Sequence, residues 1–85
     1  MSRYHIQYRD RPIDLTIAGD ELALSLDGVV RKRRRRGSGT CVYVWTNIEL
    51  HWEEHHFIEA RWWPASGRVE LTVNGRPLLE AKHDA

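Results

Sequence analysis

The residue types best suited to metal binding lie together in the stretch HWEEHH, residues 51–56. On a strand, His51, Glu53 and His55 would share a face, because strand side chains alternate between two faces. A catalytic zinc site needs three protein ligands and an open position. The stretch lacks the order H-E-x-x-H, which places a glutamate beside metal-bound water. We expect a solvated turn here, with metal binding by His51, Glu53 and His55 as the alternative.

Thiol chemistry could come only from Cys41, the single cysteine. One cysteine leaves no partner for an intrachain disulfide and cannot build a thiolate zinc cage. Cys41 stands at the start of an alternating apolar segment, which is typical of a small packed side chain. Gly37-Ser38-Gly39 lacks the following Lys-Ser/Thr of a phosphate-binding loop. We therefore expect no enzyme activity, no cofactor and no metal.

A run of six basic residues precedes that Gly-Ser-Gly segment. Its members are Arg31, Lys32, Arg33, Arg34, Arg35 and Arg36. Without these six cations, the formal net charge of +1 becomes −5, so the positive charge is local. Such a run can bind nucleic acid or another polyanion by releasing counterions. It also matches a nuclear-localisation type of signal, or a charged end that prevents strand-to-strand aggregation.

Four tryptophans are many for a chain of 85 residues. Trp52 and Trp62 fall on apolar faces of alternating segments, which predicts that they lie in the core. Trp45 and Trp63 fall on the opposite faces. These two are candidate anchors for a protein partner, since exposed tryptophan is enriched at binding hot spots. The alternative is that a second sheet covers them.

The elements that must position these residues are strands. Apolar residues alternate, with turns between, over residues 4–8, 13–17, 22–26, 42–52, 57–63, 69–73 and 76–82, and a further strand starts at 29–30. Asp27-Gly28 and Asn74-Gly75 are typical of type I′ hairpin turns. Pro77 lacks a backbone donor, which predicts that the last strand is an edge.

This pattern predicts an all-β fold, an antiparallel β-sandwich or meander barrel of seven to eight short strands. We expect one domain over residues 1–85, with residues 31–39 as a basic hairpin tip. The segments LALSLDGVV (22–30) and VELTVNGRP (69–77) resemble each other. Any two hairpins would look alike in this way, and two hairpins related by pseudo-symmetry are the alternative.

No apolar run approaches the about 20 residues that span a bilayer, so we expect no membrane partner. Residues 1–11 are polar and charged, without the pattern of a signal peptide, which predicts a cytoplasmic location.

The stretch FIEARWWPASGRVELTVNGRPLLE, residues 57–80, resembles the Fas apoptotic inhibitory molecule family, which has a similar Ser-Gly … Asn-Gly-Lys-x-Leu run. YHIQY and LSLDGVVRK are similar to the opening strands of that family. The resemblance implies a non-enzymatic β-sandwich that acts through protein contacts. The basic run departs from the family, whose segment after Asp-Gly is a mixed strand.

Two functions follow as hypotheses. The first is a protein-interaction module that uses Trp45, Trp63 or the sheet edge near Pro77, which would also allow a homodimer. The second is a module that binds nucleic acid or another polyanion through Arg31–Arg36.

Overall fold

The computed structural model describes residues 1–51 and 54–82. These residues form eight antiparallel strands, which confirms the expected all-β class. The strands are β1 (Ser2–Tyr8), β2 (Arg11–Ala18), β3 (Glu21–Leu26), β4 (Val29–Arg35), β5 (Val42–His51), β6 (Glu54–Trp63), β7 (Arg68–Val73) and β8 (Arg76–Lys82).

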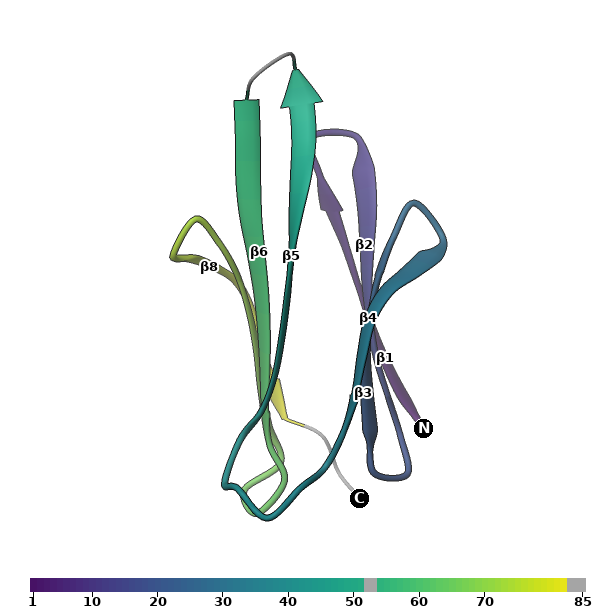
Figure 1. Cartoon of the computed structure of the whole chain (residues 1–85), viewed down its shortest axis with the longest axis vertical. Helices are drawn as coiled ribbons and strands as arrows, with labels where there is room; N and C mark the ends of the chain where they lie inside the picture. Colours follow the sequence, from purple (N-terminus) through teal and green to yellow (C-terminus); the bar gives the residue numbers. More distant parts are fainter. Residues whose placement is uncertain (52–53, 83–85) are drawn as a thin grey trace.

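The strands make two four-stranded sheets, each in chain order: β1-β2-β3-β4 and β5-β6-β7-β8. Figure 1 shows the two sheets facing each other as the layers of a sandwich, so the barrel alternative is excluded. Residues 36–41 carry the chain from one sheet to the other, and β4 and β5 are edge strands on the side where the sheets meet. In the second sheet, β8 is the edge strand on the side opposite β5, and Pro77 had predicted an edge position for it.

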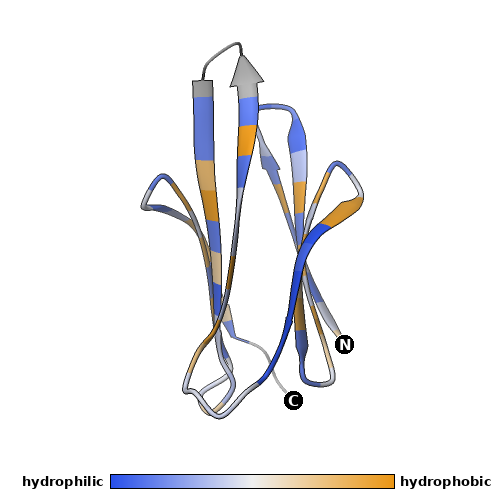
Figure 2. Ribbon diagram, in the orientation of Figure 1, coloured by the Kyte–Doolittle hydropathy of each residue, from blue (hydrophilic) through white to orange (hydrophobic). Residues whose placement is uncertain are grey.

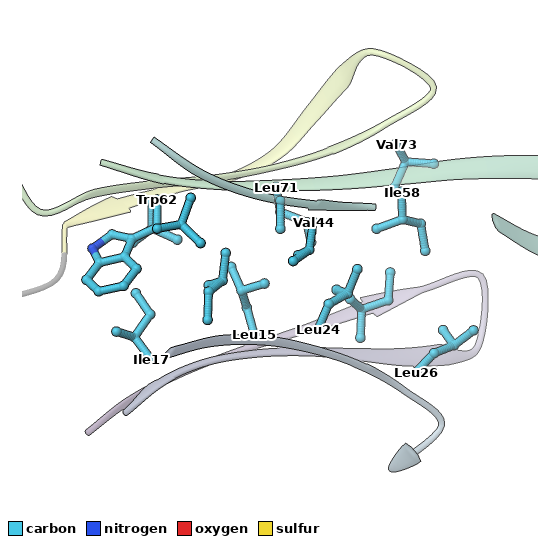
Figure 3. Packing of buried hydrophobic residues seen from close by; sticks show 14 of the residues in the cluster. Leu15, Ile17, Leu24, Leu26, Val44, Ile58, Trp62, Leu71 and Val73 are labelled. Atoms are coloured by element: carbon cyan, nitrogen blue, oxygen red, sulfur yellow. The ribbon is translucent and has the colours of Figure 1, made fainter. Parts of the chain in front are cut away.

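The core forms where the apolar face of one sheet packs against the apolar face of the other. Figure 3 shows side chains of β2 and β3 pointing toward side chains of β5, β6 and β7. Trp62 lies in this layer and is buried, as its place in the alternating pattern predicted. The fully buried residues include Ile13, Leu24, Ile58 and Leu71. Burial of two apolar sheet faces is therefore the main force that holds the layers together.

Both type I′ turns predicted from Asx-Gly pairs are present. The backbone φ angles are +54° and +79° at Asp27-Gly28, and +51° and +79° at Asn74-Gly75. Positive φ at both central residues matches the twist of the flanking strands, so these turns fix the hairpins β3–β4 and β7–β8. Arg9 and Asp10 adopt the same left-handed conformation, with φ of +46° and +64°.

The two sheets repeat the same pairing scheme. Hairpins β3–β4 and β7–β8 each contain a register shift at the same distance before the turn. In the first sheet the amide of Asp27 donates to the carbonyl of Pro12 at 3.0 Å. In the second sheet the amide of Asn74 donates to the carbonyl of Phe57 at 2.8 Å. The resemblance between the two sequence segments therefore extends to bulges and turn contacts.

Candidate functional site

The basic run lies in a strand and not at a hairpin tip. Residues 31–35 belong to β4, which pairs with β3 along its length, while β5 pairs only with β6. The prediction of a hairpin tip at residues 31–39 is therefore wrong. Residues 37–39 lie in the crossover between sheets. The alternation of apolar residues did not predict the length of this strand. Every residue of β4 is exposed, so the sequence shows no apolar face after Val30.

Pairing with β3 divides the basic side chains between two faces. Lys32 stands opposite Leu24 and Arg34 stands opposite Leu22, and both leucines point into the core. Directly opposed residues share a face of the sheet. Lys32 and Arg34 therefore project on the side that faces the second sheet. Figure 2 shows the hydrophilic stretch of β4 across from β5.

Arg33 and Arg35 of β4 meet carboxylates on the outer face. The Arg33 guanidinium lies 3.5 Å from Glu21, and Arg35 lies 3.8 Å from Asp20 and 3.9 Å from Glu21. These arginine side chains are well exposed, and exposed pairs at such distances contribute about 0 to 1 kcal/mol. Arg33 and Arg35 thus have two weakly held carboxylates as partners, and the surface of the run stays positive.

Side chains of β4 also reach the open edge of β5. Arg31 donates to the carbonyl of Asn47 and Arg34 donates to the carbonyl of Tyr43, each at 3.4 Å. The Lys32 ammonium lies 5.5 Å from the centre of the Trp45 ring. Long donor–acceptor distances of this kind mark weak hydrogen bonds. The two edge strands are therefore joined by side chains and not by a backbone ladder.

An open cavity of about 370 Å³ lies between these two strands, and we call it the basic groove. Its lining residues are Lys32, Arg33, Arg34, Tyr43, Val44 and Trp45. A second hollow of about 330 Å³ continues toward the crossover and is lined in part by Arg34, Arg35 and Ser38. The groove thus brings three of the predicted basic residues together with Trp45, one of the two predicted aromatic anchors.

Trp45 and Trp63 both lie on the outer face of the second sheet, as their alternation indicated. Trp45 is 43% exposed and stacks on Phe57, with ring centres 5.1 Å apart. Trp63 is half-buried beneath the Arg68 guanidinium, 5.0 Å from its ring centre. Trp45 is therefore the more accessible anchor, and only Trp45 lines the basic groove.

Tyr43, which lines the groove, is held in place by Glu59 and Arg61. Its hydroxyl donates to Glu59 at 2.6 Å, and the Arg61 guanidinium lies 4.9 Å from its ring centre. The hydrogen bond to Glu59, followed by desolvation and the carboxylate charge, raises the pKa of Tyr43. Because the folded pKa lies above the unfolded one, this contact stabilises the fold at neutral pH. Its contribution is lost as the pH rises through the folded pKa.

The histidine stretch includes the end of β5 at His51 and the start of β6 at Glu54, and these two residues pair with each other. Strand β6 begins at Glu54, so His55 and His56 belong to a strand, and His56 is buried with 5% of its surface exposed. Glu53, the middle member of the metal hypothesis, lies outside the described residues. Within residues 1–51 and 54–82, no group of three or more His, Cys, Asp or Glu side chains is placed to hold a metal ion. Cys41 is half-buried, with its Sγ 3.7 Å from the carbonyl of Val42.

Comparison with known proteins finds no matching family model, no matching curated protein and no matching solved structure. The resemblance to the Fas apoptotic inhibitory molecule family stays a prediction. The described part of the chain has no helix long and apolar enough to cross a membrane.

Proposed function

We propose that this protein is a non-catalytic module that binds polyanions along the basic groove. The observation that carries the proposal is the lining of that groove, where Lys32, Arg33 and Arg34 stand beside Tyr43 and Trp45. Cations supply affinity for a phosphate backbone, and exposed aromatic rings supply surfaces on which bases stack.

The arginines of β4 have weak partners that a polyanion can replace. Their contacts are backbone carbonyls at 3.4 Å and carboxylates, partly or well exposed, at 3.5 Å or more. A phosphate offers a guanidinium shorter, charge-assisted and often bidentate hydrogen bonds, about twice as strong as neutral ones. Exchange of these contacts for phosphate therefore favours binding, and no buried network has to break.

Single-stranded nucleic acid is the polyanion that can use both the cations and the aromatic rings of the groove. Lys32 now lies over the Trp45 ring, so a base that stacks there must displace it. An exposed cation–π contact is worth about 0.5 to 1 kcal/mol, whereas base stacking on an aromatic side chain is worth about 1 to 3 kcal/mol. Stacking on Trp45 thus outweighs the contact it replaces, and the released ammonium can bind a phosphate.

Trp45→Ala should weaken binding of a single-stranded oligonucleotide about 5-fold to 100-fold, because one stacking surface is lost. Retention on heparin, which has no bases, should change little. Fluorescence anisotropy with a labelled oligonucleotide and heparin chromatography measure the two effects. Trp63→Ala is the matched control, since Trp63 is also on the outer face but does not line the groove. Equal losses for both variants would contradict a role for Trp45 in stacking.

A second candidate function is protein binding at the free edge of β8, where a second copy of the chain can add a strand. This edge is favoured because β8 has a neighbouring strand on one side only and carries Leu78, an apolar residue with 36% of its surface exposed. An open strand edge pairs readily with another chain. Sedimentation velocity should show a dimer that increases with protein concentration. A monomer at all concentrations would rule out self-association.

A further inference from the structure

A larger cavity lies apart from the basic groove, between the β1–β2 turn and the β7–β8 turn. Its volume is about 410 Å³, and we call it the turn pocket. Its lining residues are Tyr8, Arg9, His56, Val73, Asn74, Arg76 and Leu78. None of them lines the basic groove, so this site is independent of the proposed polyanion binding.

Three polar side chains converge at the inner end of the turn pocket. The Tyr8 hydroxyl lies 2.8 Å from His56 Nδ1, and the Asn74 side-chain nitrogen lies 3.4 Å from the same atom. Tyr8 comes from the first sheet, while His56 and Asn74 come from the second. When the imidazole carries its hydrogen on Nε2, the single lone pair of Nδ1 accepts a hydrogen bond from the nearer of the two, the Tyr8 hydroxyl. The polar end is therefore a fixed constellation that ties the two sheets together.

Two guanidinium groups make the turn pocket positive. Arg9 lies with its guanidinium 5.8 Å from the Tyr8 ring centre, and Arg76 is exposed at the start of β8. No carboxylate is among the described residues that line the pocket, and none of the described side chains forms an ion pair with Arg76. An anion that enters thus meets two cations without having to displace a carboxylate from Arg76.

Apolar side chains line the rest of the turn pocket. Val73 is buried with 3% of its surface exposed, and Leu78 is partly exposed at the opening. The Tyr8 ring, packed edge-on to His56 at 5.5 Å, adds an aromatic wall. The volume of the turn pocket lies in the range of about 300 to 1,000 Å³ that is typical of small-molecule sites, and its lining combines apolar side chains with polar and charged ones.

We propose that the turn pocket binds a small organic carboxylate, with its apolar body against Val73, Leu78 and the Tyr8 ring and its carboxylate at Arg9 and Arg76. A guanidinium matches the geometry of a carboxylate and can bind both of its oxygens. An inorganic ion would satisfy the arginines but leave the apolar walls unused.

Benzoate and its neutral isostere benzamide test this assignment. Titration of the full chain with benzoate, followed by NMR, should shift the methyl signals of Val73 and Leu78 and the ring signals of His56. Benzamide should bind at least about tenfold more weakly, since it lacks the charge that the guanidiniums recognise. Arg76→Ser should weaken benzoate binding about tenfold, because a charge-assisted hydrogen bond is lost.

Arg68→Ser is the matched control, because Arg68 is an exposed arginine of the same sheet outside the pocket. It should leave benzoate binding unchanged. Absence of shifts up to the solubility limit of benzoate, equal binding of benzamide, or an equal loss in the Arg68→Ser variant would each overturn the proposal. Salt-dependent binding of oligonucleotides is measured separately, so either site can fail without the other.

Discussion

Simultaneous replacement of Lys32, Arg33 and Arg34 with serine should lower the affinity for a single-stranded oligonucleotide roughly 100-fold or more at about 0.1 M salt. Each phosphate contact contributes about 0.7 to the slope of log K against log salt for single strands, so loss of three contacts should also reduce that slope by about two. The three residues line the basic groove and are exposed, so replacement of their side chains leaves the core intact. Anisotropy titrations at several salt concentrations measure both quantities.

The control for this variant removes the same charge elsewhere. Arg3, Arg68 and Lys82 are exposed cations outside the groove, and their replacement with serine gives the same net charge. This control should retain most of the affinity and nearly the full salt slope. If both triple variants lose affinity equally, binding depends on net charge alone, and the basic groove is not the site.

Leu24→Ala should lower the free energy of unfolding by about 2 to 5 kcal/mol, the usual cost of truncating a buried leucine. Leu24 is 0% exposed in the centre of β3, where it packs between the two sheets. Domains of this size have a total stability of about 5 to 15 kcal/mol, so the loss is a large fraction of it. The melting temperature should fall by roughly 10 to 30 °C. Circular dichroism during heating measures the shift.

Leu78→Ala makes the same chemical change at the surface. Leu78 is 36% exposed on the edge strand β8, so fewer of its contacts are lost. We expect its cost to stay below about 1 kcal/mol, since little apolar area returns to water. Similar melting temperatures for the two variants would contradict the sandwich core as described.

The strands with one apolar face were predictable from the sequence. Alternation marks β2, β3, β5, β6 and β7 because one side chain in two points into the core. Asp27-Gly28 and Asn74-Gly75 were predictable for a different reason, since few residues tolerate the positive φ that both turns require. Arg9-Asp10 adopts the same conformation without a glycine, so the sequence contained no comparable indication.

The basic strand could not be predicted from periodicity. Side chains of β4 are exposed on both faces because the strand lies at the edge of its sheet. Charged residues therefore occupy both faces, and apolar and polar residues do not alternate. What keeps it extended is pairing with β3, which is a contact with another segment and not a local preference. The contacts of Arg31 and Arg34 with β5 also depend on how the sheets face each other.

The turn pocket was missed for a similar reason. Tyr8, His56 and Asn74 come from both sheets, and nothing local links them. The histidine stretch looked like a polar turn because charged and polar residues dominate it. The strand begins within that stretch, at Glu54, and this buries His56 against Tyr8.

The order of the strands has a consequence for how quickly the chain folds. Every backbone ladder joins strands that are neighbours in the chain, and the two sheets share no strand. Hairpins of this kind close short loops, so the entropy cost of each pairing is small. All-β proteins fold slowly when distant segments must pair, whereas a low contact order favours fast folding. We expect the hairpins of each sheet to form early, and the docking of the two layers to complete the fold.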